Sequence, residues 1–203
     1  MIKRSWILVL TISLWLAGAS WANAVPKRPM ETLEGPFNQI IAVLNDPALR
    51  GPDKKTLQRD KIWEIASPFF DFDEISRRAI GKSWATFTPD EKKRFTSIFS
   101  EFLGNTYIDK IQGEYHNDKI DFEKELVKGT KALVRTRLRR ETAEIPIDYR
   151  MQQVDGVWKI YDILVENGVS IVKNYYVQFH SMLQDGTPAQ LIERLEKKLS
   201  TRN

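Results

Sequence analysis

The sequence of 203 residues contains no cysteine and only two histidines, His116 and His180. Without cysteine the chain has no disulfide, no thiol nucleophile and no thiolate ligand for a metal. Neither histidine belongs to a motif with metal-ligand spacing, and glycine-rich phosphate loops and the G-x-S-x-G motif of hydrolases are also missing. The sequence therefore argues against an enzyme, and we expect no catalytic residue, no metal and no cofactor.

The chain also lacks a strong excess of one charge, because it has 31 Lys and Arg residues and 27 Asp and Glu residues. A nucleic acid partner, which requires a strongly basic surface, is not expected. The longest apolar run covers residues 6–19, about 14 residues against the roughly 20 that a transmembrane helix needs. It follows Lys3 and Arg4 and precedes the small residues Ala22 and Ala24. This arrangement predicts a signal peptide over residues 1–24; an uncleaved membrane anchor is the alternative.

The remaining residues, 25–203, suit a single domain with its own core. An exported chain without cysteine can be neither cross-linked by disulfides nor acylated on an N-terminal cysteine, so its stability must come from packing. We expect a soluble monomer in the periplasm.

Apolar residues recur at helical spacing on both sides of a middle section with strand-like alternation. Capping boxes begin two of the helices, at Thr88 with Glu91 and at Thr187 with Gln190. The pattern predicts helices over residues 32–44, 54–67, 72–80, 88–115, 169–183 and 187–199, and strands over residues 119–127, 131–140, 143–154 and 157–165. Short connections make the strands an antiparallel meander. The fold class is α+β, a four-stranded antiparallel sheet with helices packed on one face and enclosing an apolar cleft.

A two-residue turn at Asp155-Gly156 predicts the register of the last two strands. It pairs Val154 with Val157, Met151 with Ile160, Tyr149 with Asp162, and Ile147 with Leu164. One helix-covered face then gathers Ile147, Tyr149, Met151, Trp158, Ile160 and Leu164, with Asp162 as its one acid. Asp162 is either a general base or a structural acceptor for Tyr149 or for backbone N–H groups of the helix after Gly168. We favour the structural role, because no catalytic partners accompany it.

The first hairpin carries alternating charges. A three-residue loop centred on Gly129 places Glu123 opposite Arg135 and Asp121 opposite Arg137. These side chains are expected to form solvated ion pairs, each worth less than about 1 kcal/mol. A basic patch for an anionic headgroup or an acidic partner is the alternative.

Several sequence blocks carry a family resemblance. Residues 70–81 (FDFDEISRRAIG) come before Trp84 and Thr88-Pro89, and residues 147–149, 156–162 and 166–172 follow in the sheet and after it. Asn174-Tyr175 and Gln178-Phe179 complete the set. Their order and spacing, across roughly residues 35–200, resemble the MlaC or toluene-tolerance family. Residues 45–54 match no block, and Tyr176 stands where family members often have arginine.

The resemblance implies a periplasmic carrier that holds phospholipid acyl chains in an apolar cleft. It also implies transient partners, an outer-membrane lipoprotein/porin complex and an inner-membrane ABC transporter complex. A hopanoid or other polycyclic lipid is an alternative ligand. Two further functions compete with lipid carriage: a small steroid-type enzyme with Asp162 as base, and an adaptor that binds only proteins.

Together with the alternation of the strands and the helical spacing, the resemblance predicts which residues line the cleft. They are apolar, and all are expected to face the acyl chains: Ile75, Ala79, Phe99, Phe102, Leu103, Ile145, Ile147, Tyr149, Val169 and Val172. An ordinary hydrophobic core is the alternative for each of them.

Overall fold

The computed structural model describes residues 27–166 and 168–201, so the predicted signal peptide lies outside the described residues. The helices are α1 (Pro29–Asn45), α2 (Lys55–Ala66), α3 (Phe72–Ile80), α4 (Pro89–Glu114), α5 (Ile171–Gln184) and α6 (Pro188–Ser200). The strands are β1 (Lys119–Lys128), β2 (Lys131–Arg139), β3 (Glu144–Val154), β4 (Val157–Val165) and β5 (Val169–Ser170). Within the described residues, none of the helices combines the length and the apolar character needed to cross a bilayer.

The predicted α+β order is confirmed, but the antiparallel sheet has five strands, in the order β1-β2-β3-β4-β5, where four were expected. The extra strand occupies Val169 and Ser170, the first residues of a predicted helix. Ser170 is the N-cap of α5, and its side chain accepts a hydrogen bond from the Lys173 N–H. An N-cap residue has extended backbone, so the residues at this cap lie flat beside β4 and pair with it.

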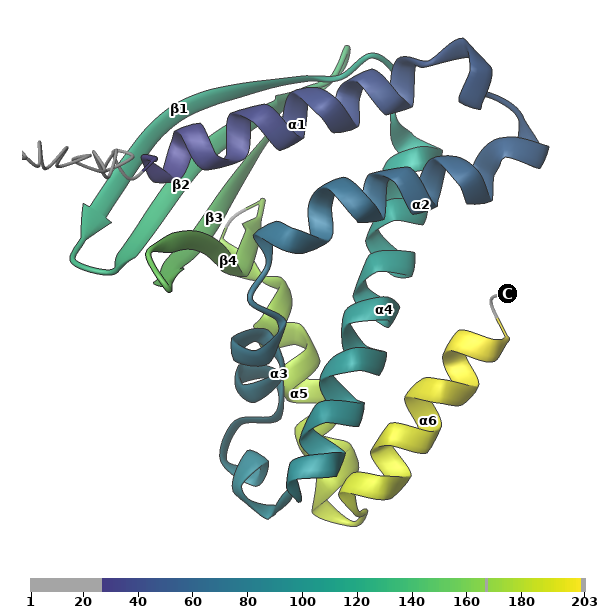
Figure 1. Ribbon diagram of the computed structural model, residues 1–203, viewed down its shortest axis with the longest axis vertical. Helices are drawn as coiled ribbons and strands as arrows, with labels where there is room; N and C mark the ends of the chain where they lie inside the picture. The colour runs from purple at the N-terminus through teal and green to yellow at the C-terminus, as the bar shows by residue number, and fades with distance from the viewer. Residues whose placement is uncertain (1–26, 167, 202–203) are drawn as a thin grey trace, which may run out of the picture.

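Helix α1 lies along the inner face of the sheet (Figure 1). Leu33 of α1 packs there against Val134, Tyr149 and Met151. Glu125 of β1 accepts a hydrogen bond from the Met30 N–H at 3.0 Å, which places a carboxylate at the positive end of the helix dipole. One face of the sheet is thus covered by a helix, as predicted.

A β-bulge changes the register of the last hairpin. Arg150 pairs with Asp162 and Met151 with Ile160, so Tyr161 is an extra residue in β4. The predicted pairs near the turn are confirmed, whereas Tyr149 faces Ile163 and Ile147 faces Val165. The predicted pairing of these two residues with Asp162 and Leu164 is therefore wrong. One inserted residue moves every later side chain to the opposite face, and Ile163, not Leu164, packs on the inner face.

A second bulge lies in β1 at Glu123. The hairpin turn has two residues, Gly129 and Thr130, because Lys128 pairs with Lys131; the expected three-residue loop is wrong. Asp121 does face Arg137, as predicted, but Glu123 does not face Arg135. The Glu123 carboxylate accepts instead from the Arg137 guanidinium. The bulge leaves Glu123 without a partner in the β1–β2 register, and its side chain reaches diagonally to Arg137.

Helices α3, α4, α5 and α6 form a second core below the sheet (Figure 1). Phe95 and Phe99 of α4 lie at its centre against Phe179 of α5. A third, small core joins Leu44, Ile62 and Ile108 from α1, α2 and α4. The interior is therefore divided into a sheet core, a helical core and a small core between α1, α2 and α4.

Candidate lipid-binding site

Most of the predicted lipid-binding residues lie in the helical core or pack against it: Ile75, Ala79, Phe99, Phe102, Leu103 and Val172. Ala79 and Phe99 are completely buried. The cavity beside Phe102 and Tyr175, between α4, α5 and α6, measures only about 10 Å³, space for about one water molecule. In the structure described, these residues therefore pack directly against one another with almost no empty space between them.

The other predicted residues come from the sheet. Ile147 and Tyr149 belong to the sheet core, where the Tyr149 ring packs edge-on against Phe37 at 5.4 Å. Ile145 is half-buried opposite Leu138 in the register of β2 and β3. Val169 is 47% exposed in β5. The structure thus places six of the ten residues in the helical core and two in the sheet core, while Ile145 is half-buried outside both and Val169 is exposed. Their contact with a ligand stays a prediction.

Three aromatic side chains connect the cores, and we call Trp63, Phe70 and Phe72 the aromatic seam. Phe70 packs against both the sheet core and the helical core, Phe72 against the helical core, and Trp63 against the small core. The ring centroids of Phe70 and Phe72 are 5.5 Å apart, as are those of Phe72 and Trp63. The seam is where the three cores meet.

Asp71 holds the seam in place. Its N–H donates to the Ile160 carbonyl at 2.8 Å, and its Oδ2 accepts from Gln152 Nε2 at 2.8 Å. Its other carboxylate oxygen accepts from the Glu74 N–H and caps α3. The cap expected from the sequence is confirmed, and the same residue ties the neighbouring aromatic rings to the edge of β4.

Trp63 lies against the backbone of α4 at Gly104. A Cβ added to Gly104 would be 2.5 Å from Cζ3 of the indole ring, far inside van der Waals contact. A glycine in the middle of a helix costs about 1 kcal/mol relative to alanine, so this glycine is explained by the close approach of the ring. Neither residue was identified from the sequence, although a glycine interrupting a periodic helix is a recognisable signal.

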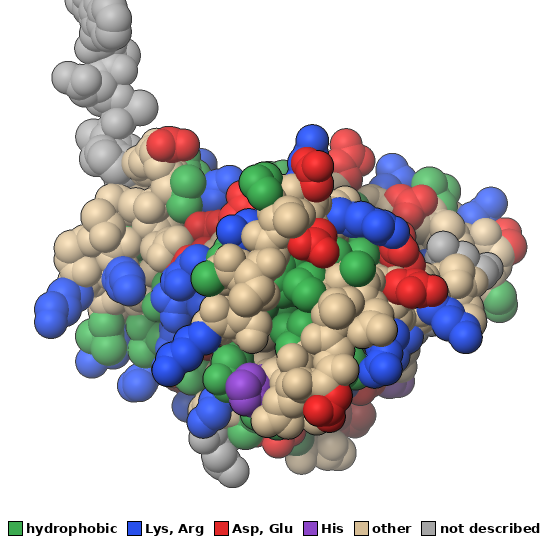
Figure 2. All heavy atoms as spheres, turned by 90° about the horizontal axis from the view of Figure 1, so that it is seen from below, with side chains coloured by type: hydrophobic (Ala, Val, Ile, Leu, Met, Phe, Trp, Pro, Cys, Tyr) green, Lys and Arg blue, Asp and Glu red, His purple; other side chains and the backbone are tan. Residues whose placement is uncertain are grey.

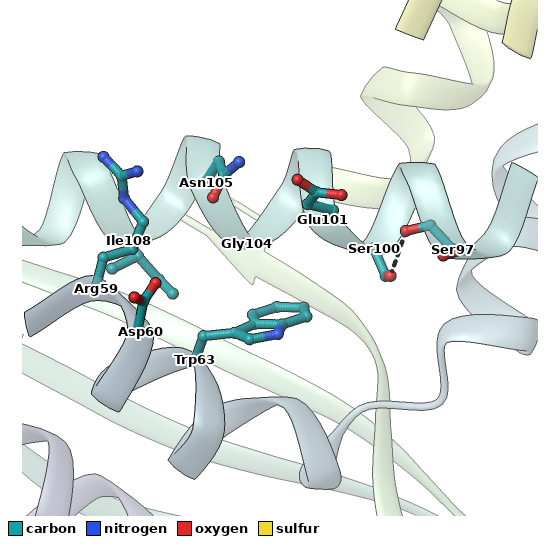
Figure 3. Close-up of a pocket in the computed structure, with 9 residues that line it drawn as sticks. All are labelled: Arg59, Asp60, Trp63, Ser97, Ser100, Glu101, Gly104, Asn105 and Ile108. Atoms are coloured by element: carbon teal, nitrogen blue, oxygen red, sulfur yellow. Dashed lines mark hydrogen bonds between the residues drawn. The ribbon is translucent and has the colours of Figure 1, made fainter. Parts of the chain in front are cut away.

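A groove of about 400 Å³ lies between α2 and α4, and Trp63 forms part of its wall (Figure 3). Trp63 points from α2 toward α4, beside Gly104 and Ser100. One turn away along the helices, Arg59 Nη2 lies 2.7 Å from Asp109 Oδ1 and ties the two helices together. The groove has the following lining: Arg59, Asp60, Trp63, Ser97, Ser100, Glu101, Gly104, Asn105 and Ile108. Polar side chains thus surround a groove that ends on the indole of the aromatic seam.

Two tyrosine hydroxyls have raised pKa values, that of the half-buried Tyr107 and that of the buried Tyr149. Burial, and then the neighbouring Tyr175 hydroxyl, raise the pKa of Tyr107 well above its ordinary value. Burial also raises the pKa of Tyr149, against a smaller opposite effect of its hydrogen bond with Thr136. A phenol of ordinary pKa 10 is already protonated near neutral pH, and burial keeps both hydroxyls protonated to higher pH.

Asp162 is 5% exposed and its carboxylate is fully engaged. It accepts hydrogen bonds from Arg150 Nη1 at 3.1 Å, from Ser170 Oγ at 2.9 Å and from the Val172 N–H at 3.3 Å. The expectation that it accepts from backbone at the start of the following helix is confirmed. Tyr149, the alternative donor, does not serve, because the bulge turns Asp162 to the outer face of the sheet, away from that ring.

The other titratable side chains that the structure describes are not grouped as a catalytic or metal site. In residues 27–166 and 168–201, no three His, Cys, Asp or Glu side chains are grouped as metal ligands. His116 is exposed, with Nδ1 2.8 Å from the Glu114 carbonyl oxygen. His180 stacks on Tyr176, whose ring lies so close to Gly81 that a Cβ there would overlap it. The tyrosine at this position thus serves packing between α3 and α5.

Comparison with known proteins agrees with this architecture. The family model described as MlaC protein matches residues 36–197. The toluene tolerance protein ttg2D of Pseudomonas putida is 24% identical over 190 residues, which are 90% of this chain and 83% of the relative. A phospholipid-binding protein from Ralstonia solanacearum, solved in complex with a phospholipid, has a TM-score of 0.73 at 22% identity, covering 86% of this chain and 98% of that one. The similarity to the solved structure shows a shared fold.

Proposed function

The chain belongs to the MlaC protein family, and from this premise we propose that it is a periplasmic phospholipid carrier. The protein would shield acyl chains from water and pass them between an outer-membrane lipoprotein/porin complex and an inner-membrane ABC transporter complex. Each CH₂ group removed from water contributes about 0.8 kcal/mol, so two acyl chains supply ample driving force for binding. The phospholipid complex of the structural relative supports this choice of ligand.

The observation that carries the proposal is the divided interior. A single, continuous core would have to be broken to admit acyl chains, whereas here three cores meet at the aromatic seam. A groove of about 400 Å³ leads from the surface to Trp63, a volume within the range of ligand sites. We propose that acyl chains enter between α2 and α4, displace Trp63 and lie along the seam.

This placement gives the predicted lipid-binding residues a common role. Phe70 of the seam contacts the core that holds Tyr149 and the core that holds Phe102 and Leu103. Acyl chains that separate these cores would have residues of the sheet on one side and residues of α4 on the other. The headgroup would remain in the polar groove.

Extraction of the purified, exported protein with organic solvent, followed by mass spectrometry, tests the ligand. We expect about one phospholipid per protein. A triterpenoid would identify the hopanoid alternative, and protein that is lipid-free in repeated preparations would favour the adaptor. N-terminal sequencing of the same material should begin at Val25, whereas a retained Met1 in detergent-extracted membranes would contradict export as a soluble protein.

Photo-crosslinking tests the position of the acyl chains. Benzoylphenylalanine in place of Trp63 or Phe72 should crosslink to the bound lipid. The same substitution at Phe95, in the centre of the helical core, is the matched control and should not. Crosslinking at Phe95 alone would place the ligand inside the helical core and contradict the seam.

An enzymatic function of steroid-isomerase type is less well supported. Its base would be Asp162, but Arg150, Ser170 and the α5 backbone already donate to both carboxylate oxygens. A general base must instead reach a substrate proton within hydrogen-bond distance. A lipid carrier that catalyses nothing is the function that this geometry supports best.

A further inference from the structure

The outer face of the sheet, opposite α1, carries lysines at the end where the β1–β2 and β3–β4 turns lie. Alternation and the register place them with apolar residues on this one face. We call this set the lysine face: Lys124, Lys128, Lys131, Lys159, Leu126, Leu133, Val154 and Val157. The three lysines of β1 and β2 are exposed, and Lys159 is half-buried.

Three of the lysines form a row across four strands. Lys128 pairs with Lys131, Lys131 pairs with Gln152, and Gln152 pairs with Lys159. Neighbouring strands are only about 4.8 Å apart, and like charges directly opposite each other destabilise a sheet. Among the described residues, the four lysines of this face form no ion pair, although the Asp71 carboxylate accepts from Gln152 Nε2 at 2.8 Å within the row. The row therefore has a cost in the isolated protein that an anionic partner would remove.

At the opposite end of the same face, basic side chains are paired with acidic ones in contact with solvent. Arg137 pairs with Glu123 and Glu144, and Arg139 pairs with Asp121. Cross-strand ion pairs are present here, as the sequence predicted, but with other partners: Arg135 pairs with Asp148, Arg137 with Glu123 and Arg139 with Asp121. The excess positive charge is confined to the lysines near the turns.

Apolar side chains project to solvent among these lysines. Val157 is 53% exposed and Leu126 is 45% exposed. Figure 2 shows hydrophobic side chains surrounded by Lys and Arg on the side of the molecule where the strand turns lie in Figure 1. Exposed apolar groups ringed by basic ones are typical of surfaces that bind at a membrane interface.

We propose that the lysine face docks the protein on an anionic phospholipid surface. Lysine is a flexible point charge that follows diffuse negative charge, whereas arginine suits fixed, bidentate recognition. Protein–protein interfaces are depleted of lysine and enriched in arginine, so the composition favours a membrane over an acidic protein. This goes beyond carriage of a lipid inside the domain, because a carrier that met only protein partners would not require it.

Co-sedimentation with vesicles tests the proposal. The full mature protein is mixed with vesicles of phosphatidylcholine containing 30% phosphatidylglycerol, or with vesicles of phosphatidylcholine alone. We expect binding to the anionic vesicles only, weakened by salt. Each lysine near an anionic surface contributes roughly fivefold in affinity, so the combined variant Lys128→Gln, Lys131→Gln, Lys159→Gln should bind about 100-fold more weakly.

The control removes the same charge elsewhere. Lys54→Gln, Lys55→Gln and Lys61→Gln change exposed lysines in and beside α2, and this variant should bind within about threefold of the parent. Equal loss in both variants would show only a net-charge effect and overturn the proposal, as would equal binding to both kinds of vesicle. Unchanged vesicle binding with lost binding to an acidic protein would assign the face to a protein partner. Mass spectrometry of lipid carried by the variants separates this surface from the interior site, since their lipid content should not change.

Discussion

The contact between Trp63 and Gly104 predicts that the effect of Gly104→Ala on the free energy of unfolding changes sign when the indole ring is removed. Alanine is favoured over glycine by about 0.8–1.0 kcal/mol in a helix interior, so Gly104→Ala would ordinarily stabilise α4. Here the added Cβ would lie 2.5 Å and 2.6 Å from two carbons of the indole ring. Overpacking of this kind costs about 1–3 kcal/mol. We therefore expect Gly104→Ala to lower the free energy of unfolding by up to about 2 kcal/mol.

Removal of the ring should change that sign. Trp63 is half-buried, and Trp63→Ala alone should cost about 2 kcal/mol in lost packing, below the range for fully buried aromatic residues. With the ring gone, only the helical preference remains, and Gly104→Ala should stabilise by about 1 kcal/mol. The two changes should thus be coupled by about 1–3 kcal/mol, a size typical of residues in contact.

Urea denaturation followed by circular dichroism measures all four members of the cycle. The proteins must be delipidated first, because a ligand that binds only the native state raises its apparent stability. Gly113→Ala is the matched control: Gly113 belongs to the same helix, and a Cβ added there has nothing within 4 Å. It should be neutral or stabilising by up to about 1 kcal/mol, with or without Trp63.

The predicted coupling is refuted if Gly104→Ala stabilises the parent protein as much as it stabilises the Trp63→Ala variant. If the cycle behaves as expected, the same variants test the entry of lipid. Gly104→Ala displaces the ring toward the groove, so phospholipid uptake by the delipidated protein should change in rate, whereas Gly113→Ala should leave it unaltered.

Three further predictions concern other parts of the molecule. Asp162→Ala leaves its hydrogen-bond donors unpaired and should cost about 1–3 kcal/mol in urea denaturation; Asp162→Asn should cost less, and an unchanged midpoint for both would contradict a structural role. Val169→Glu should fold normally because the side chain is 47% exposed, and mass spectrometry should find it lipid-free; a full lipid load would exclude Val169 from the site. Burial opposes ionisation of Glu74, but hydrogen bonds from Arg77 and Arg78 outweigh it and lower the pKa. A lowered pKa stabilises the fold above the unfolded value of 4.5 and this stability is lost as pH falls through the folded value. Glu74→Gln should therefore cost less than about 1 kcal/mol at pH 7, and in melts the difference should shrink as the pH falls below 4.5.

Local signals in the sequence predicted the elements well because each depends on a few neighbouring residues. The capping box of Thr88 is present, with the Glu91 N–H donating to the Thr88 hydroxyl at 3.2 Å. The Asp155-Gly156 turn is present as well, with Val154 opposite Val157. Helix α3 begins at the Asp71 cap as expected. The class of the fold followed from the order of these elements.

The two bulges show where prediction from local patterns failed. An extra residue at Tyr161 leaves the alternation of apolar and polar residues plausible on either side, so the sequence does not reveal it. Its consequence is large, because Asp162 moves to the outer face and Ile163 replaces Leu164 on the inner one. Only the hydrogen bonds between whole strands decide such a register.

The candidate site divides in the same way. From the sequence alone one could determine that the chain has many apolar and aromatic residues and few catalytic motifs. The sequence also showed that it carries family motifs and that its N-terminus resembles an export signal. Tertiary structure decided which of these residues share a core, that Trp63 rests on Gly104 across 41 positions of the chain, and that Lys128, Lys131 and Lys159 form one row. The physical reason is that periodicity records which face a residue occupies on its own helix or strand, while contacts between distant elements depend on how those faces are packed together.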